Sequence, residues 1–87
     1  MSALFTRGEW FVADSGIEVQ VEGGSICEVH WLPNAKLIAA APNLYAACVA
    51  SREVIDRLAR GEQLSAEEAY AIGRLVGGAI HKAETGK

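Results

Sequence analysis

The length, composition and charge of the chain limit what it can be. It has 87 residues, 51% of them hydrophobic, and a formal net charge of −3 with eight Lys and Arg residues. A chain of this size buries only roughly 60–65% of its unfolded surface, so a modest core is expected and a deep substrate cavity is not. The apolar content argues against disorder. The basic residues form no cluster, so we expect no direct nucleic-acid binding.

The first third of the chain has the pattern of a three-stranded antiparallel sheet. An N-terminal arm at residues 1–8 precedes strands that are rich in aromatic and β-branched residues. Asp14 with Gly16, and later Gly23 with Gly24, supply the turn residues between them. The strands are predicted at residues 9–13, 17–22 and 25–31.

Alternation along these strands assigns side chains to two faces. The face that we expect to be covered carries Val19, Val21, Cys27, Val29, Trp31 and one of the neighbours Trp10 and Phe11. The face that we expect to be open carries Glu18, Gln20, Glu22, Glu28 and His30, and Ile26 falls on the same side of the third strand. An antiparallel sheet with one wet face suits this division.

Two helices are predicted after the sheet. Apolar residues recur at steps of three and four over residues 34–60, and Pro42 should break that helix near residue 41 into a short and a long piece. We interpret Pro42 as a fixed corner rather than a hinge. Gly61 is expected to end the long piece. Ser65 with Glu68 forms a capping box for a last helix over residues 65–83.

The expected fold is therefore α+β, with a three-stranded antiparallel β-meander followed by a Pro-kinked helix and a C-terminal helix (βββαα). We expect one small domain over residues 1–87, in which the first helices cover the inward face of the sheet.

The segment NAKLIAAAPNLYAA at residues 34–47 resembles a segment NA(K/R)LIAAAP(E/D)LL of small proteins from tailed phages and prophages. The resemblance extends more loosely over residues 8–31, does not cover the C-terminal third, and departs from the pattern at Tyr45, where Leu is usual. It implies a phage or prophage origin and no particular reaction.

Neither a metal site nor a catalytic set is expected. Cys27 and His30 form a C-x-x-H string, but on a strand their side chains leave opposite faces, and zinc needs about four converging ligands. Cys27 and Cys48 are expected to be buried thiols in a reducing cytoplasm. No nucleophile–base pair or phosphate loop is evident, so we predict a protein without enzymatic activity or a cofactor. The N-terminus lacks the pattern of a signal peptide, and no segment has the length of a membrane span.

Two surfaces are candidates for contact with partners. The first is the acidic face of the sheet with adjacent residues: Glu9, Trp10, Glu18, Gln20, Glu22, Glu28 and His30. The alternative is that this face is only exposed to solvent and binds nothing. The second is a stripe of small residues on the last helix, Ala69, Gly73 and Gly77. Small residues four apart allow two helices to approach closely. The stripe therefore indicates either packing against residues 39–50 of the same chain, which we take as the default, or a homodimer interface.

These patterns together predict a non-enzymatic phage accessory protein that binds a host or phage protein in the host cytoplasm. Inhibition of a host defence system, of the anti-CRISPR kind, is the specific form that we consider. The alternative is a structural or assembly module that associates with itself, for example as a homodimer, through the stripe of Gly73 and Gly77. Neither alternative involves direct contact with nucleic acid or a membrane.

Overall fold

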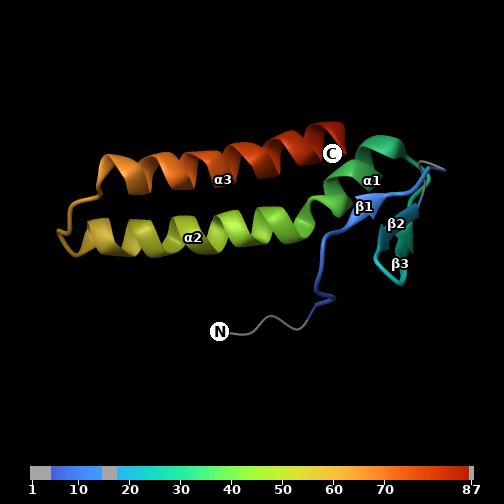
Figure 1. Cartoon of the computed structure of the whole chain (residues 1–87), viewed down its shortest axis with the longest axis horizontal. Coiled ribbons are helices and arrows are strands. Elements are labelled where there is room, and N and C mark those ends of the chain that lie inside the picture. The colour runs from blue at the N-terminus through green and yellow to red at the C-terminus, as the bar shows by residue number, and fades with distance from the viewer. Residues whose placement is uncertain (1–4, 15–17, 87) are drawn as a thin grey trace.

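A computed structural model describes residues 5–14 and 18–86 of the chain. Three strands come first and three helices follow (Figure 1), which confirms the predicted α+β order once the Pro-kinked helix is counted as two. Most of the predicted turn at residues 14–16, and the start of the predicted second strand, lie outside the described residues. The elements are β1 (Phe11–Val12), β2 (Glu18–Val21), β3 (Gly24–Glu28), α1 (Leu32–Ala39), α2 (Ala41–Ala59) and α3 (Ala66–Thr85).

The sheet is an antiparallel meander in the order β1-β2-β3. Val12 pairs with Val19, and Val19 with Cys27, so these three side chains share one face. The register shifts between Val19 and Gln20, because Gln20 pairs with Ser25 and leaves Ile26 as an extra residue in β3. Such a bulge bends the strand locally. Ile26 therefore packs against the core beside Cys27, and its predicted outward position is wrong.

The core is small and consists largely of alanine. Val19, Ala35 and Ala39 have no exposed surface and form the centre of the cluster. Ala35 and Ala39 are four apart on α1, which places both against the sheet. Around them pack Trp10, Val12, Ile26, Cys27, Val29 and Ile38. Trp10 is thus the inward member of the Trp10 and Phe11 pair.

The predicted third strand is too long at its end. β3 stops at Glu28, and Trp31 is the N-cap residue of α1 rather than a member of the sheet. Trp31 is 64% exposed, so its predicted inward position is wrong. Strand alternation no longer applies beyond Glu28, because the chain turns there to enter the helix.

The corner between α1 and α2 is tightly packed. Ala40 lies between the helices with φ −84° and ψ −5°, and its N–H donates to the carbonyls of Lys36 and Leu37, each 3.1 Å away. Pro42 lies in the first turn of α2, where a missing N–H costs nothing. Ala39 and Ala40 are wholly buried in this corner. The helix breaks at Ala40, within two residues of the predicted position.

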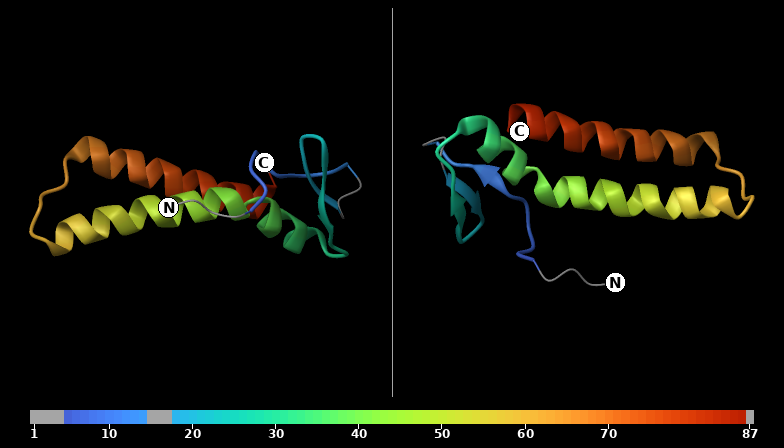
Figure 2. Two further views of the ribbon diagram at one scale, coloured as in Figure 1. Left: turned by 90° about the horizontal axis from the view of Figure 1, so that it is seen from below. Right: turned by 180° about the vertical axis from the view of Figure 1, so that it is seen from behind.

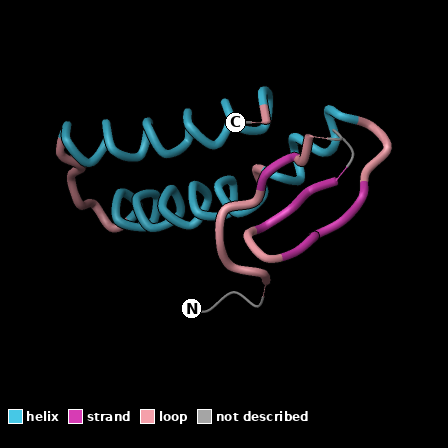
Figure 3. The backbone as a smooth tube through the Cα atoms, turned by 45° about the vertical axis from the view of Figure 1, so that its right-hand side comes forward, coloured by secondary structure: helices cyan, strands magenta, loops and turns pink. Residues whose placement is uncertain are grey.

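From this corner α2 leaves the sheet and forms a long hairpin with α3. The two helices run antiparallel and side by side (Figures 1 and 2), while the sheet and α1 lie together at one end (Figure 3). Only α1 covers the sheet broadly, contrary to the expectation that the first helices would share that role. The molecule measures 48 × 25 × 18 Å.

The loop at the far end of the hairpin follows its predicted chemistry. Gly61 adopts φ 85°, a left-handed conformation that suits glycine, and its N–H donates to the carbonyl of Leu58 at 3.0 Å. Ser65 Oγ accepts the N–H of Glu68 at 3.1 Å, while a Glu68 carboxylate oxygen accepts the N–H of Ser65 at 3.3 Å. The predicted helix end and capping box are both confirmed.

A buried lysine ties the N-terminal segment to α3. The side chain of Lys82 is 6% exposed, and its Nζ donates to Glu9 Oε1 at 3.4 Å. We expect Glu9→Ala to lower the free energy of unfolding by about 1–3 kcal/mol, because it leaves a buried ammonium without its partner. Lys82→Met should be nearly neutral, since it removes the charge and keeps the volume. Urea titration measures both, and equal losses would contradict this account.

Candidate functional site

Large apolar side chains are exposed along the helical hairpin. Scattered exposed side chains are normal, but a contiguous apolar patch indicates an interaction surface. Ile55 is 61% exposed, Tyr70 67% and Ile80 48%. Tyr45, Val49, Leu58 and Leu75 are also at least 40% exposed. A two-helix layer explains this exposure. Along most of the hairpin α2 and α3 pack only against each other, and each apolar stripe is wider than one neighbouring helix can cover.

Some of these side chains gather in an open groove between α2 and α3. The groove has a volume of about 360 Å³, and Ser51 and Arg52 are its polar residues. We call it the hairpin groove. Its apolar lining comes from Leu44, Ala47, Cys48 and Ile55 of α2 with Val76 and Ile80 of α3.

The stripe of small residues borders this groove. Gly73, Val76, Gly77 and Ile80 follow one another at helical spacing, so they lie on one side of α3. A Cβ placed on Gly73 or Gly77 would meet no atom within 4 Å. The prediction that the stripe packs closely against residues 39–50 is therefore wrong. Gly73, Gly77 and Ala69 are all exposed. The glycines serve no close contact within the described part of the chain.

The structure brings together only part of the predicted acidic surface. Glu18 pairs with Glu28 across the sheet, and Gln20 donates a hydrogen bond to Glu18. Phe11 pairs with Gln20, so Phe11 rather than Trp10 shares this face. Glu22 and His30 are exposed but lie just beyond the ends of β2 and β3.

The other two members of that predicted surface have different environments. Glu9 is paired with Lys82 of α3. Trp10 packs inward and donates its indole N–H to the carbonyl of Thr6 at 3.1 Å. Because Glu9 and Trp10 are engaged within the chain, the acidic face is smaller than the sequence indicated.

An aromatic hollow that was not predicted lies where the N-terminal segment meets α2. The ring of Phe5 stands edge-on to Tyr45, with centroids 5.2 Å apart, and to Trp10, at 6.5 Å. These rings, with Ala41 and Pro42, line a hollow of about 380 Å³. One signal for it in the sequence was Tyr45, where the phage pattern usually has Leu.

The two cysteines differ in exposure. Cys27 is half-buried in the sheet cluster, whereas Cys48 is exposed in the hairpin groove, so the prediction of two buried thiols is wrong for Cys48. The helical pattern placed Cys48 on an apolar stripe but did not show that the stripe lacks a cover. Across residues 5–14 and 18–86, no three His, Cys, Asp or Glu side chains are grouped so that they could hold a metal ion.

Comparison with known proteins places the chain among phage proteins. A family model described as Salmonella phage P22 protein Y8K6 matches residues 1–87. The chain belongs to this phage protein family. The match confirms the phage origin implied by the sequence resemblance, and it covers the whole chain without singling out residues 34–47. Neither curated proteins nor solved structures gave a significant match. None of the helices in the described residues is long and apolar enough to cross a membrane.

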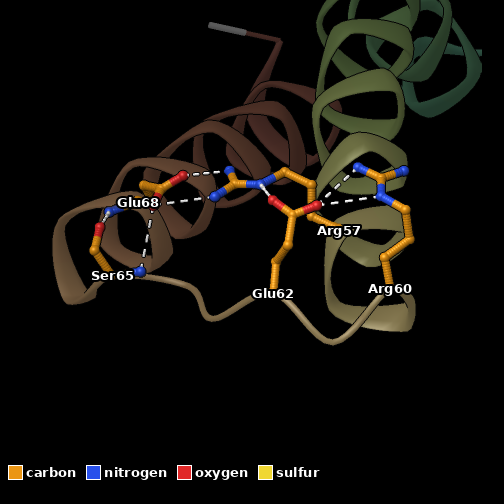
Figure 4. Close-up of polar contacts among 5 residues, drawn as sticks. All are labelled: Arg57, Arg60, Glu62, Ser65 and Glu68. Carbon is orange, nitrogen blue, oxygen red and sulfur yellow. Dashed lines mark hydrogen bonds and ion pairs between the residues drawn. The ribbon is translucent and has the colours of Figure 1, made fainter.

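In this member of the phage family, ion pairs hold the far end of the hairpin together (Figure 4). Arg57 of α2 pairs with Glu68 of α3 and donates from Nε to Glu62 at 3.4 Å. Arg60 pairs with Glu62 at 3.0 Å. Hydrogen bonds lower the pKa of Glu68 from 4.5 to about 2. The bond from Arg57 has the largest effect, and those from Ser65 come next. The cluster fixes which residues of the two helices lie side by side.

We expect the hairpin to lose stability in acid through Glu68. A carboxyl whose pKa is lowered on folding stabilises the fold above its unfolded pKa, 4.5, and the stabilisation is lost as the pH falls toward the folded pKa, about 2. In urea titrations, Glu68→Gln should therefore lose less stability than the wild type between these two pH values. Glu67→Gln, in the same helical turn, is the matched control. If Glu68→Gln kept the wild-type acid dependence, the ion pair would not stabilise the hairpin.

Proposed function

We propose that this phage protein acts by binding another protein, without catalysing a reaction, and that the hairpin groove is its binding surface. One observation carries the proposal. The chain exposes 6228 Å² of surface, whereas a compact protein of 9.2 kDa exposes about 4,900 Å². Its radius of gyration is 15.2 Å, against about 12 Å for a compact chain of this length. The surplus reflects the elongated shape, whose hairpin carries the apolar groove.

The character of the groove supports a protein partner over other ligand classes. Its lining is apolar apart from Ser51 and Arg52, and the chain is acidic overall, which disfavours nucleic acid. A helical face of this kind suits a partner that contributes apolar helical side chains. Membership of a phage family supports a partner present in the infected cell. A host defence protein, including a CRISPR component, is the specific form of this proposal.

Paired variants test which surface binds. Ile55→Asp places a charge in the hairpin groove, and Glu28→Lys reverses a charge on the sheet face; both positions are exposed, so both variants should fold. Tagged proteins are used to capture partners from infected cells, with circular dichroism as the folding control. We expect Ile55→Asp to abolish capture and Glu28→Lys to retain it. The reverse result would assign partner binding to the acidic face of the sheet. If both variants still captured the partner, neither surface would be the binding surface.

A further inference from the structure

Building on the proposed function of the hairpin groove in protein binding, we infer that a second copy of this chain occupies the groove whenever no other partner is bound there. Two hairpins pack groove to groove about a two-fold axis that is perpendicular to the helices. Each α2 then lies antiparallel to α2 of the copy, and each α3 antiparallel to α3 of the copy. The product is a four-helix bundle with the two sheets at opposite ends.

The surplus surface matches what such a dimer requires. The exposed area exceeds that of a compact chain by about 1,300 Å², and a stable interface of ordinary size covers about 800 Å² on each partner. The groove lies within this surplus, and two of the side chains that line it, Ile55 and Ile80, are 61% and 48% exposed. Pairing would turn a single layer of two helices into two layers with a shared interior.

The glycines of α3 fit a close approach by a second helix. A glycine inside a helix costs about 1 kcal/mol relative to alanine, and this chain contains two on the side that borders the groove, Gly73 and Gly77. Nothing lies within 4 Å of where their Cβ atoms would be. An approaching α3 from a second copy would use that space.

Charge and register point to the same two-fold axis. Arg52 and Asp56 lie one turn apart on the exposed side of α2, so an antiparallel copy centred between them brings each Arg52 to the other chain's Asp56. The Arg57–Glu68 ion pair sets the hairpin register, and counting equal steps along both helices places Val54 beside Ala71. That level of α3 is midway between Ala69 and Gly73, so small residues cross where the opposite charges of α2 meet.

Sedimentation equilibrium of the full chain tests the dimer and its glycine contact. We expect the wild type to have twice the 9.2 kDa chain mass at micromolar concentration. Gly73→Leu should weaken the dimer at least about tenfold, because a leucine there blocks close approach. Gly78→Leu is the matched control: Gly78 has the same empty surroundings but lies about 140° from Gly73 around the helix, and it should leave the dimer unchanged.

A charge exchange tests the register. Arg52→Asp alone should weaken the dimer, because it places like charges opposite each other, and Arg52→Asp combined with Asp56→Arg should restore it. The exchange would not restore binding to a different partner protein, because the charges on that partner do not change.

A monomeric wild type at about 100 µM, far above the dissociation constant of an interface of ordinary size, would overturn the inference. The proposed function would then stand if Ile55→Asp still abolished capture of another protein, and would fall with the inference if it did not. A dimer that tolerates Gly73→Leu, or that the charge exchange fails to restore, would use another surface and would also overturn the inference.

Discussion

Val19→Ala should lower the free energy of unfolding by about 2–3 kcal/mol. Among the described residues, Val19 is the largest side chain that is completely buried, and it lies at the centre of the cluster that joins the sheet to α1. Its removal loses the transfer free energy of two methyl groups and leaves a cavity between Ala35 and Ala39, which are too small to fill it. The total stability of a domain of this size is only several kcal/mol, so the loss is a large fraction of it.

Urea titration at low protein concentration measures this loss without a contribution from association. Val49→Ala is the matched control, because it makes the same substitution at an exposed position on α2. We expect it to change the free energy of unfolding by less than about 0.5 kcal/mol. If both variants lost the same small amount, the cluster around Val19 would not be the core that holds the sheet to α1.

Replacing Gly73 and Gly77 together with alanine should have two opposite effects. The monomer should gain about 1–2 kcal/mol in free energy of unfolding, because alanine favours the helix and the added Cβ atoms meet nothing within 4 Å. The dimer should weaken, because the same Cβ atoms hold the two α3 helices apart. Few substitutions are expected to stabilise a fold and impair its association at once.

Gly61→Ala separates this effect from a general preference for alanine. Gly61 has φ 85°, a conformation that costs other residues about 1–2 kcal/mol, so the substitution there should destabilise the chain. Thermal melts at low and high protein concentration would show both effects. A double alanine variant that strengthened the dimer would indicate that the glycines have no part in association.

Local chemistry allowed much of the fold to be predicted. The capping box of Ser65, the left-handed Gly61 and the break before Pro42 each depend on a few neighbouring residues. The first two lie where the sequence placed them, and the break lies within two residues of its predicted position. The errors in the sheet have non-local causes. Alternation cannot show the bulge at Ile26, and it cannot show that helix formation draws Trp31 out of the strand.

The candidate site was harder to predict because a pattern shows which face is apolar but not what covers it. Cys48 belongs to the apolar stripe of α2 and was expected to be buried. In the described part of the chain, however, α3 is the one helix that runs along α2, and the stripe extends past it. The glycine stripe was visible in the sequence. The choice between a contact inside the chain and one outside depended on the distance from Gly73 to its neighbours, which only the structure supplies.

The reactivity of the Cys48 thiol tests most directly whether the hairpin groove is covered in the working protein. Dilute purified chain, concentrated chain and infected-cell lysate would each be treated briefly with a maleimide. Mass spectrometry separates Cys48 from Cys27, because trypsin releases them in the peptides 37–52 and 8–36. We predict that Cys48 reacts quickly in the dilute chain and at least about tenfold more slowly in the other samples, with Cys27 unchanged. Equal reactivity of Cys48 in all three samples would contradict the account.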